Sequence, residues 1–337
     1  MHPDETRDMT DKDPVVPDHP TMLAAMRLAC RAPSVHNTQP WRWVFDGTRL
    51  RLYTDTDRQL LATDPRGRQQ LISCGAGLHH LRSAFAAYHW HTDTVRLPDP
   101  AQPQHLATVE FRPWPDPPDG IRARTDAIDR RYTDRLPMLE PQRWDDIVHT
   151  LRKLVSPHEI ELDVLDESAR ARLSTASEQS AALRRYDMQY QAELQWWTGH
   201  REMPEGIPPT SMVSDADFAR VGVGRAFPPV PHSMRRAEIE DRARLVVLSS
   251  TDDSAMQWLH TGEALSVLLL ECTAAGLNTC ALTHITEVPA GRRLLAGLTA
   301  YDGLPQVVVR IGTAPDDHEP PPTPRRPLTD VFTTRRG

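Results

Sequence analysis

Long apolar runs, paired cysteines and lysine are all scarce in this sequence, and each scarcity excludes a class of protein. No apolar run approaches the roughly 18 residues that a membrane span needs, so we expect no membrane-spanning segment. The four cysteines show no C-x-x-C spacing, which argues against a zinc site or a disulfide framework and favours a reducing cytoplasm. Lysine occurs only at Lys12 and Lys153, and the net charge of -7 predicts no nucleic-acid partner.

The start of the chain has neither the basic first residues nor the apolar core of a secretory signal. Its first twenty residues, MHPDETRDMTDKDPVVPDHP, mix acidic residues with prolines. We therefore expect residues 1–19 to form a disordered tail. The remaining length fits about two domains at roughly 150 residues each.

A regular order of elements is predicted between residues 20 and 120. Apolar residues at helical spacing predict a helix from Thr21 to Cys30, and Pro33 ends the pattern. Alternating residues on either side of Asp46-Gly47 predict a two-stranded hairpin. The mostly apolar segment LISCGAGLHHLRSAFAAYHW predicts a core helix, and HLATVEF predicts a closing strand.

The same order recurs between residues 121 and 330, which indicates an internal repeat. A helix near 142–154 precedes a strand in VSPHEIELDV. The long apolar segment SAMQWLHTGEALSVLLLECTAAG then predicts a second core helix, and LPQVVVRIG predicts its closing strand. Two tandem halves in one chain follow from this repeat.

The two halves differ in length at one place. Aligning Pro33 with Pro157 gives an offset of 124 residues, whereas aligning Gly75 with Gly262 gives 187, so the second half carries 63 additional residues between these points. We place the insertion at about 186–232. Long loops inside compact proteins are usually functional lids or disordered linkers, and the large apolar side chains here favour a lid. The lid residues that we single out are Trp196, Trp197 and Met203.

Three polar segments carry the chemistry: APSVHNTQPWRW (32–43), RRYTDR (130–135) and PPTPRRPL (321–328). Guanidinium groups next to a hydroxyl suit phosphate, because their N–H forks match phosphate oxygens. Taken singly, each arginine pair is more often a solvated surface feature than a phosphate site. Asn37-Thr38-Gln39-Pro40 alone is equally compatible with a polar turn capped by core tryptophans. The three segments together are more specific than any one of them.

In combination, these segments resemble the nitroreductase-like flavoprotein superfamily and, within it, the mycobacterial Acg family, whose APSxHNTQPWRW signature the first segment matches. The likeness runs from about Thr21 to Leu328. It implies an α+β, nitroreductase-like fold, FMN as the cofactor and NAD(P)H as a transient reductant. FMN needs cationic donors for its phosphate, small polar partners for its polyol, and backbone dipoles with apolar walls for its ring.

The resemblance also implies which residues bind the cofactor. The first segment would border the flavin ring, RRYTDR would hold the phosphate and ribityl chain, and GLNTC (276–280) with the residues after it would present backbone amides to flavin N5. A basic element near the C-terminus would complete the phosphate site. The implied set is Ser34, His36, Asn37, Gln39, Arg130, Arg131, Thr133, Arg135, Thr279, Cys280, Ala281, Leu282, Arg325 and Arg326.

Ordinary nitroreductases are homodimers with FMN at the interface, so two halves in one chain would form a pseudo-dimer. One composite site has all its segments. The mirror-image site would need similar segments where the chain has PDHPTM and SPHEIEL. We therefore expect one FMN per chain, in a monomer that acts on small molecules.

Two functions remain open at this point. The first is an oxidoreductase that passes hydride from NAD(P)H through flavin N5 to a nitroaromatic or quinone, with no catalytic side chain because the flavin carries the chemistry. The alternative is a flavin-binding or flavin-sequestering protein whose lid occludes the site. A metal centre is not expected, because the histidines lack ligand spacing. These histidines are His79, His80, His89 and His91.

Overall fold

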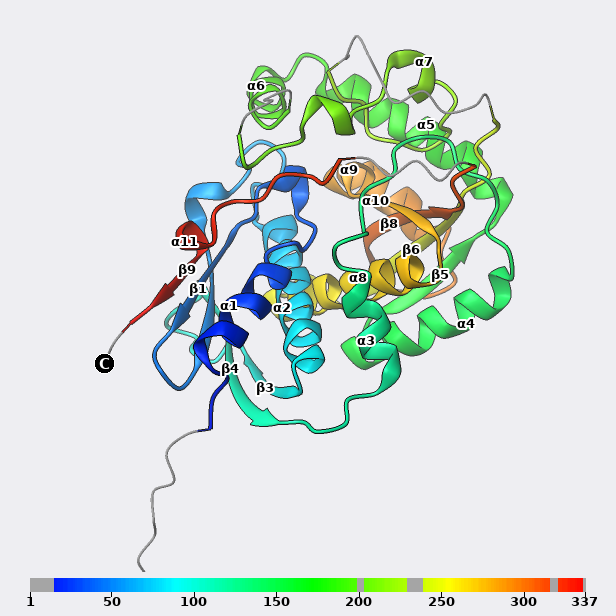
Figure 1. Ribbon diagram of the computed structural model, residues 1–337. Helices are drawn as coiled ribbons and strands as arrows, with labels where there is room; N and C mark the ends of the chain where they lie inside the picture. Colours follow the sequence, from blue (N-terminus) through cyan, green and yellow to red (C-terminus); the bar gives the residue numbers. More distant parts are fainter. Residues whose placement is uncertain (1–14, 199–202, 229–238, 316–320, 336–337) are drawn as a thin grey trace, which may run out of the picture.

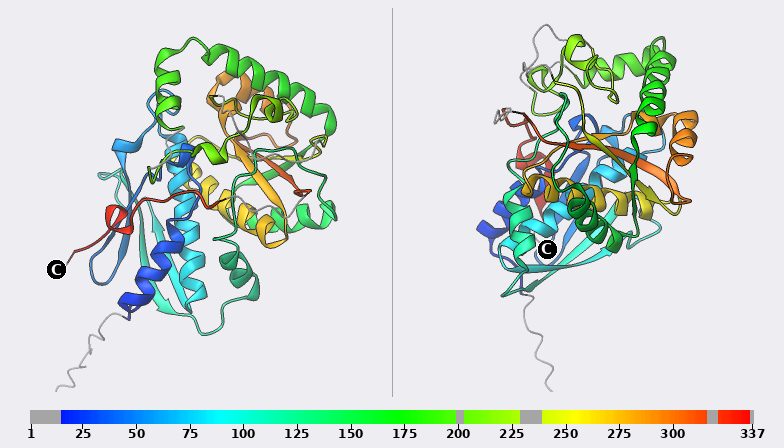
Figure 2. Two further views of the ribbon diagram at one scale, coloured as in Figure 1. Left: turned by 45° about the horizontal axis from the view of Figure 1, so that its top comes forward. Right: turned by 90° about the vertical axis from the view of Figure 1, so that its right-hand side faces the viewer.

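The computed structural model describes residues 15–198, 203–228, 239–315 and 321–335, and these residues form an α+β structure. Two β-sheets lie on either side of a central pair of long helices, α2 and α8 (Figure 1). Two further views show one sheet on each side of this pair, with a layer of helices above the second sheet (Figure 2). None of the helices in the described part of the chain is long and apolar enough to cross a membrane.

The first half alternates short helices with antiparallel strands. Its elements are α1 (His19–Ala29), η1 (Val35–Asn37), β1 (Trp41–Phe45), β2 (Leu50–Thr54), η2 (Thr56–Arg58), α2 (Arg68–Ala87), β3 (Trp90–Arg96) and β4 (His105–Pro113). Asp18 begins α1 by accepting a hydrogen bond from Thr21 N at 2.8 Å, so the tail expected at 1–19 already enters a helix at His19. Residues 1–14 of that expected tail lie outside the described residues.

The hairpin expected around Asp46-Gly47 is confirmed. Strands β1 and β2 pair antiparallel from Trp41↔Thr54 to Phe45↔Leu50, and Gly47 takes the positive φ of +100° that a tight turn requires. Trp41 and Trp43 point to the same face of β1 and are fully buried in the first hydrophobic core, whereas Arg42 between them is exposed. The two tryptophans after Pro40 are therefore core residues.

The expected first core helix, residues 71–90, has the right length but lies three residues too far along the chain. Helix α2 ends at Ala87, not Trp90, because Tyr88 caps it and His89 adopts a φ of +62°. Trp90 instead begins β3, which pairs with β4 along its whole length. Burial explains the ending, since the helix is buried through Ala86 whereas Tyr88 and His89 are exposed.

The second half has a similar order but a much longer central connection. Its elements are α3 (Asp119–Asp126), α4 (Trp144–Val155), η3 (Ser156–His158), β5 (Glu161–Leu165), α5 (Glu167–Arg184), α6 (Met188–Trp196), η4 (Pro209–Ser211), α7 (Asp215–Phe218), β6 (Arg244–Ser250), α8 (Ala255–Ala274), β7 (Asn278–Leu282), α9 (His284–Glu287), α10 (Pro289–Ala296) and β8 (Leu304–Gly312). The expected helices near 142–154 and 254–276 and the expected strands near 160–164 and 304–312 are confirmed.

The two sheets have the same strand order. The first runs β3-β4-β2-β1-β9, and the second, taken from its opposite edge, runs β7-β8-β6-β5. Strands β1, β2, β3 and β4 thus correspond to β5, β6, β7 and β8. The connection between β1 and β2 spans residues 46–49, whereas the one between β5 and β6 spans 166–243, and we call the latter the long connection. The insertion expected at 186–232 lies inside it.

Helices α2 and α8 correspond residue by residue, because Arg68 matches Ala255 and Ala87 matches Ala274 at a constant offset of 187. They cross where Gly75 meets Gly262. A Cβ atom on Gly262 would lie 2.8 Å from Ala76 N and closer still to Ile72 O, and one on Gly75 would overlap Leu259 O. Only glycine allows the two backbones to approach this closely.

The C-terminal segment returns to the first half. After β8, residues 321–327 run along the first half to α11 (Leu328–Val331) and β9 (Phe332–Thr334), as the red trace in Figure 1 shows. Strand β9 pairs parallel with β1 through Trp43↔Phe332. The tail therefore belongs to the first sheet, although the second half precedes it in the chain.

The glycine crossing predicts a large difference between two similar substitutions. Gly262→Ala should lower the free energy of unfolding by about 2 to 3 kcal/mol, because the new methyl group forces α2 and α8 apart. Gly120→Ala in α3 is the control, since its Cβ would meet only the flexible guanidinium of Arg124, at 3.3 Å. Urea unfolding measures both. Equal effects of the two variants would contradict the close packing.

Candidate functional site

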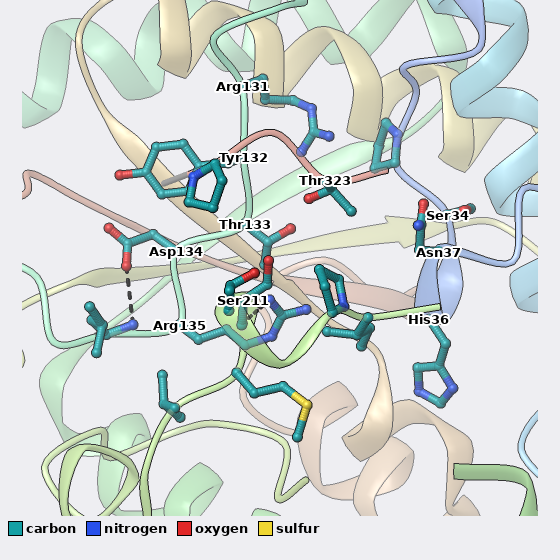
Figure 3. Close-up of a pocket in the computed structure, with 18 of the residues that line it drawn as sticks. Ser34, His36, Asn37, Arg131, Tyr132, Thr133, Asp134, Arg135, Ser211 and Thr323 are labelled. Carbon is teal, nitrogen blue, oxygen red and sulfur yellow. Dashed lines mark hydrogen bonds between the residues drawn. The ribbon is translucent and has the colours of Figure 1, made fainter. Parts of the chain in front are cut away.

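Two adjoining cavities lie between the halves of the chain, and they share one wall. The shared residues come from the segment after α1, from the segment after α3 and from the long connection: Pro33, Ser34, His36, Thr133, Arg135, Ile207 and Val213. The first cavity extends toward Arg131 (Figure 3). Arg325 also lines it. The second extends toward β7 and the N-terminal part of α2. Each half therefore supplies part of both walls.

Residues 33–40 form a compact, irregular turn that aims polar groups at this shared wall. His36, Asn37 and Gln39 all have positive φ values, of 47°, 56° and 50°. Such conformations are rare outside glycine, so hydrogen bonds must hold them. Ser34 Oγ accepts from Gln39 N at 3.0 Å, which closes the turn, and Ser73 Oγ on α2 accepts from Val35 N at 3.1 Å.

His36 faces the cavities with an unsatisfied side chain. It is 6% exposed, lines both cavities, and neither ring nitrogen has a hydrogen-bond partner among the described residues. Burial lowers its pKa well below 6.5, and the nearby charges of Arg225 and Arg135 lower it further. A neutral imidazole with two free nitrogens is equipped to contact a ligand.

Asn37 and Gln39 join three segments instead of lining one surface. Asn37 Nδ2 donates to Gly206 O at 2.9 Å and to Pro324 O at 3.1 Å, so it ties the long connection to the C-terminal tail. Gln39 Nε2 donates to Pro204 O at 2.9 Å, and its Oε1 accepts from Arg326 N at 2.8 Å. Asn37 still lines the first cavity, whereas Gln39 lines neither.

Arg131, which is buried, and Arg325, which is partly buried and donates to the carbonyls of Thr323, Pro324 and Arg31, form a cationic end to the first cavity. The Nε atoms of both have no hydrogen-bond partner, and neither side chain pairs with a carboxylate in the described part of the chain. Burial lowers the pKa of Arg131 to about 10 and that of Arg325 to about 9, and neighbouring cations, including Arg31, add to both effects. Buried guanidinium groups without a counter-charge are costly, so this end fits an anionic ligand.

Two of the expected arginines lie elsewhere. Arg130 is exposed, lines neither cavity, and its Nε atom donates to Asp126 O at 3.5 Å, because the turn after α3 directs it outward and Arg131 inward. Arg326 pairs with Asp55 at 3.4 Å and donates to Gln39 O at 3.3 Å, so it fastens the tail to the first half. These two expectations are corrected: in each adjacent pair, one arginine lines the site and the other does not.

Arg135 and Thr133 contribute to both cavities. The Arg135 Nη1 atom donates to Ser211 O of the long connection at 2.9 Å, and its guanidinium lies 5.3 Å from the ring centre of Phe227. Thr133 forms a parallel bridge with Thr279, reinforced by a hydrogen bond from Asp134 N to Thr279 O at 2.9 Å. Thr279 lines neither cavity and instead positions the 133–135 segment.

The second cavity has a mainly apolar wall. Cys280, Ala281 and Leu282 of β7 line it. The Cys280 thiol is buried, which raises its pKa and leaves it protonated and unreactive. On α2, Ser73 and Ala76 leave space next to this strand. The cavity thus combines a strand edge with small side chains, which suits a flat ring.

The long connection covers the second cavity with five apolar residues. They are Ile207, Val213, Phe218, Val221 and Phe227. The three expected lid residues are not among those that cover the cavity. Trp196 is 59% exposed at the end of α6, and Trp197 and Met203 line neither of the two cavities. Trp197 acts through its backbone, since its carbonyl accepts from Ile207 N at 2.8 Å. The covering residues lack a motif, so only the fold reveals them.

Arg225 is a further residue that sequence reasoning missed. It is buried at the wall of the second cavity, pairs with Glu287, and donates to the Tyr190 hydroxyl at 2.9 Å. Glu287 in turn accepts from Gln69 Nε2 at 3.0 Å, and Gln69 also lines the cavity. This network links the long connection to α2 and α9. No spacing in the sequence pairs Arg225 with Glu287.

Comparison with known proteins decides the family, although no family model matches the chain. A Mycobacterium tuberculosis protein named "Putative NAD(P)H nitroreductase acg" is 48% identical over 314 residues, which cover 93% of this chain and 95% of that protein. A second protein of the same organism, also named as a NAD(P)H nitroreductase, is 35% identical over 94% of this chain and 92% of its own length. The chain belongs to the Acg nitroreductase family.

Solved nitroreductase structures are also similar to this Acg-family chain. One from Desulfitobacterium hafniense with bound FMN is 12% identical and covers 63% of this chain and 97% of its own, with a TM-score of 0.39. The FMN-dependent nitroreductase NfnB from Mycobacterium smegmatis in complex with NADPH is 15% identical over 64% and 99% of the two chains, also with a TM-score of 0.39.

Among the described residues, no group of three or more histidine, cysteine, aspartate or glutamate side chains could hold a metal ion. His79 and His80 both contact Ser266 Oγ, at 2.7 and 2.8 Å, and are buried. They are structural residues of the α2–α8 contact.

The free imidazole of His36 predicts a titration result. Its ring should stay neutral from pH 8 to pH 6, because its pKa is lowered well below 6.5. The unfolded chain binds this proton below about pH 6.5, so the contribution of His36 to stability should fall as the pH drops below that value. Proton NMR of the histidine rings, assigned with His36→Gln, measures this, and a His36 midpoint between pH 6 and 7 would contradict it.

Proposed function

We propose that this protein binds one FMN across the two adjoining cavities and acts as a NAD(P)H-dependent oxidoreductase of the nitroreductase type. One observation carries the proposal: two guanidinium groups without a carboxylate partner, each with an unpaired Nε atom, end one of two adjoining cavities, and the other cavity is mainly apolar. A dianionic phosphate, a polyol and a flat ring need this sequence of surroundings. The names of the two relatives as NAD(P)H nitroreductases support the same activity.

The residues present fit each part of FMN. Arg131 and Arg325 would hold the phosphate, since their Nε atoms are buried without partners. Ser34 and Thr133 would face the polyol at the shared wall, and Cys280 to Leu282 would border the ring with backbone groups. His36 would contact the cofactor from the shared wall. When bound, FMN supplies hydride transfer between the nicotinamide and a small conjugated acceptor such as a nitroaromatic or quinone.

The chain's own residues would bind and orient, not react. Arg135 would place a fixed positive charge between phosphate and ring, because Ser211 O and the Phe227 ring hold its guanidinium. His36, being neutral, would accept or donate one hydrogen bond without changing the charge of the site. Such fixed dipoles and charges cost no reorganisation during reaction.

We further propose that residues 20–120 and 121–330 act as two nitroreductase-like halves of a pseudo-dimer, and that the chain works as a monomer. The matching strand orders and the offset of 187 between α2 and α8 support this. The same offset explains why one FMN binds. Ser73 and Ala76, which leave room for the ring, correspond to His260 and Glu263, which are bulky.

A second candidate function is flavin binding with little turnover. The observation that favours it is the cover over the second cavity, for which the 186–232 segment would act as a lid. Three contacts fasten this cover: the Arg58–Glu205 ion pair, the Asn37–Gly206 hydrogen bond, and Glu193, which accepts from Ala62 N and Thr63 N at 2.9 Å each. A fastened cover would keep nicotinamide from the ring.

The phosphate assignment predicts a contrast between neighbouring arginines. Arg131→Ala should weaken FMN binding at least about 100-fold, because a charge-assisted bond to a buried phosphate is worth roughly 1.5 to 3 kcal/mol and the arginine makes more than one. Combined with Arg135→Ala, it should yield colourless protein. Arg130→Ala is the matched control and should keep FMN. Flavin content after purification and fluorescence titration measure this; stoichiometric FMN in the double variant would refute the assignment.

Anaerobic reduction distinguishes the two functions. If the protein is a reductase, NADPH or NADH should bleach the flavin absorbance of the unmodified chain within seconds. If the cover excludes nicotinamide, the unmodified chain should stay yellow, and Phe218→Ala with Phe227→Ala should restore bleaching because both side chains line the cavity. Trp196→Ala is the control, since Trp196 is exposed and lines no cavity. A chain that stays oxidised in every variant would contradict the reductase.

A further inference from the structure

A third cavity lies on the other side of the α2–α8 pair, between α2, β3, α3 and α4. Four cationic side chains line it: Arg82, Arg96, Arg124 and Lys153. No aspartate or glutamate belongs to its lining. A lining whose charged side chains are all cationic is the arrangement expected of an anion site.

The charges around this cavity do not cancel. Glu263, fully buried on α8, accepts from Arg96 Nε and Nη2 at 2.6 and 2.8 Å and from Arg82 Nη1 at 2.9 Å, so one carboxylate faces two guanidinium groups. Arg124 is neutralised by Glu271 at 2.9 Å. Lys153 has no carboxylate partner among the described residues. The cluster therefore keeps an excess of positive charge.

Arg82 also has an unused donor. Its Nε atom is buried and has no hydrogen-bond partner, while Nη1 is taken by Glu263. A buried donor without an acceptor destabilises the folded chain, and a ligand oxygen would supply the missing acceptor. The histidines in the wall add no charge, since burial lowers the pKa of His158 to about 4 and also lowers that of His79.

The position of this cavity mirrors that of the proposed flavin cavity. Each lies against the edge strand of one sheet, β3 or β7, and near a short helix from the opposite half, η3 or η1. Glu263 with its two arginines stands where Ala76 leaves space on the flavin side. The third cavity thus has cationic donors but no slot for a flat tricyclic ring.

We propose that the third cavity binds a phosphate group, free or carried by a small organic molecule, through Arg82, Arg96 and Lys153. This goes beyond the proposed function and does not depend on it. Trp114, Ile121 and Leu154 supply an apolar part of the wall, which offers room for a small organic substituent. Guanidinium forks and an ammonium group are the donors that phosphate prefers.

Binding is tested by isothermal titration of the full chain, loaded with FMN, with inorganic phosphate and with phenyl phosphate at constant ionic strength. Lys153→Glu should weaken binding about tenfold, because it reverses one exposed charge at the cavity. Arg82→Met should weaken it further by removing the free Nε donor. Arg293→Glu is the matched control, since it makes the same change of charge at an exposed position on α10 outside the cavity.

Each outcome of the phosphate titration either supports the proposal or overturns it. Saturable binding that Lys153→Glu weakens and Arg293→Glu leaves unchanged supports the proposal, and tighter binding of phenyl phosphate than of inorganic phosphate identifies an organic phosphate as the ligand. Absence of saturable binding, or equal affinities in Lys153→Glu and the unmodified chain, overturns it. The comparison of Lys153→Glu with Arg293→Glu remains valid if the chain carries no FMN, because both variants leave Arg131 and Arg325 unchanged.

Discussion

The contact between Gly75 and Gly262 is the constraint on which the rest of the structure depends. It brings the backbones of α2 and α8 closer than any side chain would permit, and so it sets the separation of the two sheets. The second and third cavities lie on either side of this crossing, and each takes part of its wall from both helices. A wider crossing would move Ser73 and Ala76 away from β7 and separate the two walls of the site.

Local patterns predicted much of the fold. The hairpin around Asp46-Gly47 and both core helices follow from spacing that neighbouring residues carry. The sequence analysis missed strand β3 for two reasons. The alternating positions of this strand that face inward hold Thr92 and Thr94 instead of large apolar residues, and the strand follows α2 almost directly. Strand β9 could not be predicted, since its partner β1 lies near the other end of the chain and three residues carry no periodic signal.

The candidate site was predictable in its segments but not in every side chain. Resemblance brought together the 32–43, 130–135 and 321–328 segments, and the structure places a residue from each beside one cavity. Which arginine of a pair faces inward depends on the backbone direction at a turn, and no local sequence pattern predicts that direction. Arg130 and Arg131 illustrate this. Arg225 and Phe227 were beyond reach because the long connection has neither periodicity nor a motif.

The position of Arg325 in the chain determines when the first cavity can be completed during synthesis. Arg325 follows both sheets' main strands in the chain, and β9, which holds the tail against β1, comes later still. Arg325, which borders the first cavity, is therefore synthesised only after β1 to β8 of both sheets. The two halves can pack around α2 and α8 before that moment, but the first cavity gains its Arg325 wall only after the tail has been added.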